Sequence, residues 1–191
     1  GLTFEVGLRA LLRQDPDIIM VGETRDAETA SISVRAAITG HLVLSTLHTN
    51  DAASSVVRLA DMGVEPYMIA SSLVGIIAQR LVRKVCPFCS EWEDMTEDEI
   101  AIAGKYFPKI KHVKGCKQCN NTGYKGRISI HEILPVTKDV RTLISQGAST
   151  EQIKEYAINN LGMMTLKQSG LKLVEEGVTT VEELIKVSYY D

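Results

Sequence analysis

The 191-residue chain lacks any apolar run long enough to cross a bilayer, and its start lacks a secretion signal. Its most apolar stretch, residues 67–82, contains serine, glutamine and arginine and falls short of the roughly 20 apolar residues that a spanning helix needs. Gly1 begins the chain without an initiator methionine or a basic segment. We therefore expect neither an integral membrane helix nor a secretory leader, and we expect the chain to be a fragment.

The sequence also has few aromatic residues and a small net charge. Aromatic side chains make up 5% of the sequence, and 21 basic against 24 acidic residues leave a formal net charge of −3. This balance excludes a broadly basic surface, so binding of a polyanion by the whole chain has no support. The 45% of hydrophobic residues instead favours a globular protein with an aliphatic core.

The first third of the chain alternates strands and helices. Residues 17–22 and 42–47 are short apolar runs, which are typical of strands buried on both faces. Asp26 can cap a helix between them, and Gly40 can end that helix. A strand, a helix and a second strand predict a βαβ unit with two parallel strands.

The remaining patterns are mostly helical. We expect helices over residues 50–61, 66–84, 140–145, 150–160, 166–175 and 181–187, and a strand over residues 126–134. Residues 90–99 are acidic and residues 105–127 are basic. The basic stretch could contact nucleic acid, but few aromatic residues interleave with it, so a solvated face that balances the acidic stretch is favoured.

Four cysteines form two tight pairs, Cys86-x-x-Cys89 and Cys116-x-x-Cys119, with 26 residues between the pairs. Two such pairs without a secretion signal favour a metal site over disulfides, and four thiolates suit tetrahedral Zn²⁺. Four protein ligands leave no open position, so the predicted metal is structural. We interpret the nearby His112 as a surface side chain.

Two polar motifs follow the two predicted strands. Glu23 ends the first strand, and Thr46 and His48 follow the second, so we expect them at one edge of a parallel sheet. There Glu23 could orient a water molecule or bind Mg²⁺ through water, and His48 could contact a phosphate oxygen. Taken singly, each motif also fits an ordinary strand end or a helix-capping loop. The residues leave the roles of Arg25, Arg80 and Arg83 open.

Several segments resemble the type II secretion and type IV pilus assembly ATPases. Residues 8–26 are similar to the Walker B region of this family, residues 39–52 to its His box, and residues 79–82, 123–127 and 132–134 to the segments around its cysteine pairs. The retraction branch of the family generally lacks the tetracysteine element. The cysteines therefore favour the assembly or secretion branch.

The resemblance implies an α/β fold, namely the C-terminal half of a RecA-like P-loop NTPase core with a zinc-binding insert and a helical subdomain. Residues 1–84 would be the core, residues 85–127 the insert that holds zinc through Cys86, Cys89, Cys116 and Cys119, and residues 128–191 a strand and helical subdomain. Glu23 would be the catalytic glutamate and His48 the sensor of the γ-phosphate. Both, with Thr46, would contact ATP and Mg²⁺.

The resemblance also implies a homo-hexameric motor at the cytoplasmic face of a bacterial inner membrane. It would associate with the membrane through partners, chiefly a polytopic platform protein, and would bind no nucleic acid. The sequence contains no Gly-x-x-x-x-Gly-Lys-Ser/Thr loop to cradle phosphates, so we expect this chain alone to be inactive. The alternative hypothesis is a non-catalytic zinc module that binds a protein or nucleic acid.

Overall fold

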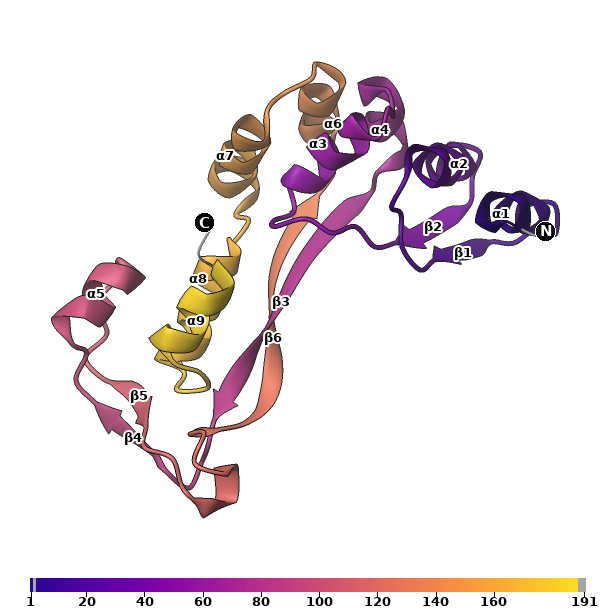
Figure 1. Cartoon of the computed structure of the whole chain (residues 1–191). Coiled ribbons are helices and arrows are strands. Elements are labelled where there is room, and N and C mark those ends of the chain that lie inside the picture. Colours follow the sequence, from indigo (N-terminus) through magenta and orange to yellow (C-terminus); the bar gives the residue numbers. More distant parts are fainter. Residues whose placement is uncertain (2, 189–191) are drawn as a thin grey trace. The chain divides into compact units, whose positions relative to one another are not determined.

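A computed structural model describes residue 1 and residues 3–188. Contacts within the chain define two compact units, each built from two stretches, Gly1–Ile77 with Ile133–Met163 and Ala78–Glu132 with Met164–Asp191. Strands and helices are mixed in both units (Figure 1). Across the described residues, no helix combines the length and apolar character needed to cross a membrane.

The first unit contains the predicted βαβ element. Its elements are α1 (Phe4–Leu12), β1 (Ile18–Val21), α2 (Ala27–Ile38), β2 (Leu42–Ser45), α3 (Ser54–Asp61), α4 (Pro66–Ser72), α6 (Lys138–Ser145) and α7 (Thr150–Leu161). β1 and β2 pair in parallel, with Ile18 opposite Leu42. Asp26 caps α2 as predicted, since its carboxylate accepts the amide of Thr29 at 2.8 Å.

The two parallel strands bury only one of their faces. Ile19 and Val21 point into a core with Leu8 of α1 and Ile32 of α2. The alternate residues are exposed, and Met20 is the most exposed of them at 71%. The other exposed residues of this face are Ile18, Leu42 and Leu44. The side chains therefore follow strand periodicity although the sequence runs are apolar throughout.

The prediction of one long helix over residues 66–84 is wrong. α4 ends at Ser72, Leu73 is extended, and β3 (Gly75–Val85) follows and pairs with β6 (Tyr124–Pro135). Burial along β3 alternates, with Ala78 and Val82 inside. The two-residue period of β3 is not visible in the sequence, because apolar residues occur on both faces of the strand. Its partner strand β6 lies far along the sequence, so a local pattern does not indicate the pairing.

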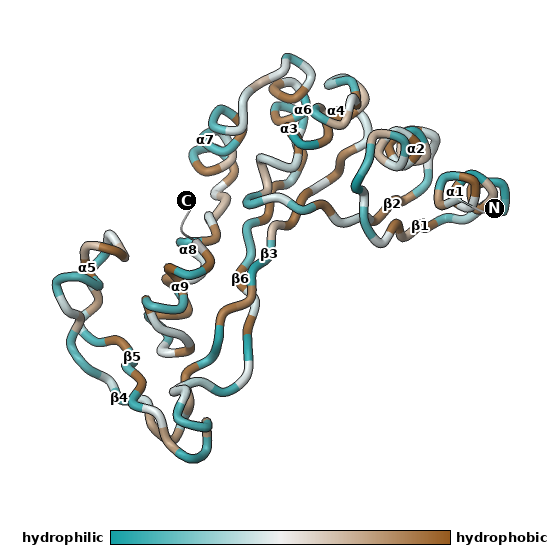
Figure 2. The backbone as a smooth tube through the Cα atoms, viewed as in Figure 1, coloured by the Kyte–Doolittle hydropathy of each residue, from teal (hydrophilic) through white to brown (hydrophobic). Residues whose placement is uncertain are grey.

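The second unit contains most of β3 and β6 together with β4 (Ser90–Glu93), α5 (Glu97–Ala103), β5 (Ile110–Val113), the short 3₁₀ turn η1 (Lys117–Cys119), α8 (Leu166–Glu175) and α9 (Val181–Ser188). β4 and β5 are antiparallel. Burial alternates along the second half of β6, where Ile130, Glu132 and Leu134 are inside, as expected of a strand with one buried face. Hydrophobic and hydrophilic residues are mixed along this strand (Figure 2).

The four helices predicted beyond residue 138 are all present, but they belong to different units. α6 and α7 lie in the first unit, whereas α8 and α9 lie in the second with the cysteines. In the first unit, the guanidinium of Arg141 on α6 donates to the carbonyl of Ala70 on α4. The division at residues 84 and 127 stays a prediction about functional parts of the chain.

Candidate functional sites

The ends of β1 and β2 are joined by hydrogen bonds that continue beyond the strands. The amide of Thr24 donates to the carbonyl of Thr46 at 3.0 Å, and the Thr46 hydroxyl donates to the carbonyl of Gly22 at 2.7 Å. The hydroxyls of Thr24 and Ser45 lie 2.8 Å apart. These bonds fix the two loops side by side, and so place the residues that follow both strands at the same edge of the sheet.

Glu23 and His48 meet at this edge. The Nε2 atom of His48 lies 2.6 Å from Oε1 of Glu23, and Arg25 contacts Oε2 at 2.5 Å. The Glu23 side chain is 20% exposed, whereas that of His48 is 88% exposed. The hydrogen bond from Arg25, helped by the charges of Arg25 and His48, outweighs partial burial and lowers the pKa of Glu23. Glu23 is therefore ionised at neutral pH and presents acceptor oxygens.

A pocket of about 210 Å³ opens beside this pair. It is lined by Glu23, Thr24, Arg25, His48, Arg58 and Met62. Arg58 and Met62 are four residues apart at the end of α3, so they share one face of that helix. Arg58 is a pocket residue that the sequence motifs do not indicate, although it lies four residues before Met62 on the helix that follows the His48 loop. Two guanidinium groups next to an imidazole suit an anionic ligand.

Thr46, which is predicted to contact the nucleotide, bonds to the end of the neighbouring strand. It is exposed, and its hydroxyl hydrogen is used by the carbonyl of Gly22. It is not among the residues that line the pocket. The geometry assigns it to joining the two strand ends, and its contact with a nucleotide stays a prediction.

The four cysteines come together in the second unit. Their sulfur atoms all lie within 4.8 Å of one another, and none is in a disulfide. The sulfurs of Cys86 and Cys116 are 3.9 Å apart, and those of Cys89 and Cys119 are 3.8 Å apart. A tetrahedral zinc ion with Zn–S bonds of about 2.3 Å requires sulfurs roughly 3.8 Å apart. The cluster therefore fits one tetrahedral metal ion.

Two glycines make the second cysteine turn possible. Gly115 and Gly123 have φ of +86° and +78°. A Cβ atom at Gly115 would lie 2.8 Å from the carbonyl oxygen of Asn121, and one at Gly123 would lie 2.7 Å from Val113. Only glycine fits both the left-handed backbone and these close approaches.

Backbone amides also point at one of the sulfurs. The amides of Cys116 and Gly123 both donate to Sγ of Cys119 at 3.2 Å. Burial raises the pKa of the Cys119 thiol, but these donors outweigh it and bring the pKa to about 6. Burial and the sulfur of Cys119 raise the pKa of Cys89 to about 12. The turn thus stabilises a thiolate, which is the form that binds a metal.

His112 differs from the surface side chain expected. Its Nε2 lies 2.8 Å from Glu99 and its Nδ1 lies 3.4 Å from Glu93, and the side chain is half-buried. Along the same β4–β5 pair, Lys114 contacts Glu91 at 2.5 Å. Lysines of the basic stretch therefore pair with carboxylates of the acidic stretch, the arrangement that the sequence favoured.

Arg25 and Arg83, which the sequence left undecided, both pair with carboxylates. Arg25 contacts Glu23, and Arg83 contacts Glu183 of α9 at 2.5 Å. Arg83 lies on β3 and not at the end of a helix. Arg80, also on β3, donates to the carbonyl of Gln79.

Comparison with known proteins gives one family match and many relatives. The model of a family described as type II/IV secretion system protein matches residues 1–186. The type II secretion system protein HxcR of Pseudomonas aeruginosa is 48% identical over 98% of this chain and 37% of HxcR. The type IV pilus assembly ATPase PilB of Myxococcus xanthus is 49% identical over 97% of this chain and 34% of PilB. The chain thus spans about a third of the length of these relatives.

Solved structures show the same fold. The pilus retraction motor PilT with bound ADP matches 97% of this chain and 43% of PilT, with a TM-score of 0.69 and 30% identity. The DotB ATPase of Legionella pneumophila matches 99% of this chain and 43% of DotB, with a TM-score of 0.68 and 22% identity. These matches confirm the predicted α/β fold as part of the fold of these ATPases.

Proposed function

Because this chain belongs to the type II/IV secretion system protein family, we propose that it is part of a motor ATPase that powers type IV pilus assembly or type II protein secretion. In this proposal the chain supplies the catalytic carboxylate and the histidine that senses phosphate. The phosphate-cradling loop, which these 191 residues do not contain, comes from another part of the motor. The cysteine pairs favour the assembly or secretion branch over the retraction branch.

The observation that carries the proposal is the Glu23–His48 pair at the carboxyl ends of parallel strands. Ligands of open α/β sheets bind at this edge. Glu23 orients the attacking water in line with the γ-phosphate, because its lowered pKa keeps it ionised as an acceptor. His48 is exposed enough to leave Glu23 and donate to a phosphate oxygen, which frees Oε1 of Glu23 for the water. Arg25 and Arg58 add positive charge beside the phosphates.

The cofactors and partners belong to the same proposal. The motor binds ATP with Mg²⁺, and Glu23, His48 and Thr46 contact the nucleotide. Six copies of the longer protein form a ring at the cytoplasmic face of the bacterial inner membrane. The ring acts on a polytopic platform protein and reaches the membrane through it. No nucleic-acid partner is proposed.

The cysteine cluster holds a structural zinc ion in this proposal. Cys86, Cys89, Cys116 and Cys119 provide four thiolates, and sulfur spacings of 3.7 to 3.9 Å support a tetrahedral ion. The ion supplies folding free energy to the second unit when bound. It takes no part in hydrolysis, because four protein ligands leave no position for a substrate.

The test is the variant Glu23→Gln in the full-length protein. We expect nucleotide binding to stay near the wild-type level while kcat falls by about 10²- to 10⁴-fold, because the amide keeps the shape but does not accept a proton. Glu28→Gln is the matched control, since Glu28 is an exposed carboxylate that pairs only with Arg9 among the ion pairs described. A wild-type kcat in Glu23→Gln would refute the role of Glu23.

The purified 191-residue chain gives a second test. We expect it to show no Mg-ATP turnover, because no backbone loop of the Gly-x-x-x-x-Gly-Lys type is present to cradle the phosphates. Measurable turnover by this chain alone, abolished by Glu23→Gln, would contradict the proposed division of the nucleotide site.

A further inference from the structure

The turn between α8 and α9 lies along β3 immediately before the first cysteine pair. The carbonyl of Val178 accepts the amide of Val85 at 2.9 Å. The Thr179 hydroxyl donates to the carbonyl of Arg83 at 2.8 Å, and the amide of Arg83 donates to Oε2 of Glu183 at 3.1 Å. Polar groups of this turn therefore satisfy the backbone of β3 just ahead of Cys86, where the strand has no second partner in the described sheet.

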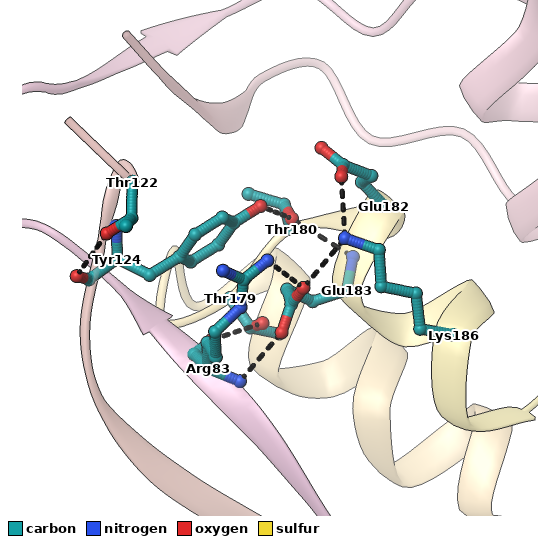
Figure 3. A network of polar contacts seen from close by, with 8 residues as sticks. All are labelled: Arg83, Thr122, Tyr124, Thr179, Thr180, Glu182, Glu183 and Lys186. Atoms are coloured by element: carbon teal, nitrogen blue, oxygen red, sulfur yellow. Dashed lines mark hydrogen bonds and ion pairs between the residues drawn. The ribbon is translucent and has the colours of Figure 1, made fainter. Parts of the chain in front are cut away.

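The same turn also contacts β6 immediately after the second cysteine pair. The hydroxyls of Tyr124 and Thr180 lie 2.8 Å apart, and both residues are buried. The guanidinium of Arg83 lies 4.0 Å from the centre of the Tyr124 ring and also binds the Glu183 carboxylate (Figure 3). One polar network, in which Tyr124, Thr180 and Glu183 are buried, thus connects β3, β6 and the start of α9.

This network continues directly into the cysteine cluster. The amide of Cys86 donates to the carbonyl of Gly123 at 2.8 Å, and the amide of Gly123 donates to Sγ of Cys119. Tyr124 is the residue that follows Gly123. The side chain that contacts Thr180 is therefore one residue away from a backbone group that contacts a sulfur.

We propose that residues 178–183, here called the α9 clamp, hold the two cysteine pairs in register and so control how long the zinc ion is retained. This inference rests on the zinc site of the proposed function. Thr180 and Glu183 are positioning residues, because they act through Tyr124 and Arg83 and touch no sulfur.

The physical reason is preorganisation. The two pairs are separated by 26 residues, so bringing them together costs loop-closure entropy unless another element holds the strands that carry them. Because the clamp holds the two strands, the loop-closure entropy is lost when the chain folds and not when the metal binds. Once the clamp is loosened, one pair can move away from the other, and a partly released ion is exposed to competing ligands.

The experiment measures zinc release from the full 191-residue chain to an excess of a chelating dye. Thr180→Val removes the hydroxyl with little change of shape, and Thr180→Ser keeps the hydroxyl. We expect release about tenfold faster in Thr180→Val, by analogy with outer-shell partners of metal ligands, and a rate near wild type in Thr180→Ser. Glu183→Gln also accelerates release, whereas the neighbouring Glu182→Gln does not, because Glu182 is exposed and pairs with Lys186 at 2.7 Å.

A spectroscopic readout separates positioning from loss of the site. With Co²⁺ in place of zinc, the thiolate-to-cobalt absorption bands keep their wild-type positions in Thr180→Val, because the four ligands are unchanged. Ile153→Val serves as a control for general destabilisation, since Ile153 is fully buried and belongs to the first unit.

The measurements test the zinc site and the α9 clamp separately. A wild-type chain that contains no zinc and binds no Co²⁺ overturns the proposed metal site. A zinc-loaded chain whose release rate is equal in wild type, Thr180→Val and Glu183→Gln overturns the clamp. The clamp is also overturned if the rate of zinc release depends only on the free energy of unfolding. In that case Ile153→Val and Thr180→Val, compared at equal destabilisation, would release zinc equally fast.

Discussion

The cysteine cluster and the Glu23 edge both gather side chains from separate segments, but they hold them differently. The four sulfurs are fixed by glycine turns, by amides that donate to Cys119 and by two paired strands. Glu23, His48 and Arg25 are fixed at their backbones, while the side chains of His48 and Arg25 are mostly exposed and contact Glu23. The first arrangement suits a permanent occupant. The second suits a ligand that enters and leaves, because its side chains can exchange partners.

Removal of one thiolate from each cysteine pair should give the largest effect. We expect Cys86→Ser combined with Cys116→Ser to abolish zinc binding and to destabilise the second unit by several kcal/mol, because metal binding is coupled to folding. Elemental analysis and hydrogen exchange measure the two results. Exchange in the first unit should stay near wild type, and a variant that keeps one zinc ion per chain would refute the assignment.

Acid should weaken the second unit through Glu183. The bonds from Arg83 and Lys186 outweigh burial and lower the pKa of Glu183 from 4.5 to about 2. A lowered pKa stabilises the fold above pH 4.5, and this stability is lost as the pH falls toward 2. The full shift corresponds to about 3 kcal/mol.

The measurement is the free energy of unfolding of wild type minus that of Glu183→Gln between pH 7 and pH 2. Because the other effects of acid on the fold are common to both proteins, this difference isolates Glu183. We expect the difference to be constant above about pH 5 and to shrink below it. A difference that does not change with pH would show that the carboxylate is not ionised in its pair with Arg83.

Loss of His48 tests whether the exposed side chains of the first unit exchange partners. In the full-length protein we expect His48→Ala to lower kcat by about 10- to 100-fold, since one phosphate contact and one partner of Glu23 are lost together. His41→Ala is the control, because His41 contacts the carbonyl of Ala36 and does not line the pocket. Equal kcat values in wild type and His48→Ala would contradict the sensor role.

Much of the fold and of both sites followed from local sequence patterns. The βαβ unit, the cap at Asp26 and the helices beyond residue 138 depend on periodicity and capping, which act over a few residues. The spacing of the cysteines was sufficient to predict their cluster. Glu23 and His48 could be placed together because parallel strands end at one edge.

The features that the sequence did not reveal depend on distant partners. The local pattern of β3 predicts a helix, because β6, the strand that pairs with it, lies far along the chain. Arg83 and Glu183 are 100 residues apart, so no local pattern joins them. Arg58 of α3 lines the same pocket as Glu23 and His48, and this grouping depends on how α3 packs and not on a local motif.

Two glycines that end helices, Gly177 in the second unit and Gly162 in the first, differ in what surrounds them. The ring of Trp92 packs against the backbone of Gly177. Gly177 and Gly162 both follow helices with left-handed φ of +69° and +66°. A Cβ atom at Gly177 would lie 2.5 Å from the Trp92 ring, whereas one at Gly162 meets nothing within 4 Å. Alanine at either site costs about 1 to 2 kcal/mol for its backbone.

Gly177→Ala should therefore destabilise its unit by about 1 kcal/mol more than Gly162→Ala, since the ring must shift as well. Trp92 is the single tryptophan of the sequence, so its fluorescence reports that shift directly. We expect a red-shifted emission in Gly177→Ala and a wild-type spectrum in Gly162→Ala. Equal costs and unchanged emission in both variants would mean that β4 is not anchored on the α8–α9 turn, and that the support of the cysteine cluster from α9 is confined to β3 and β6.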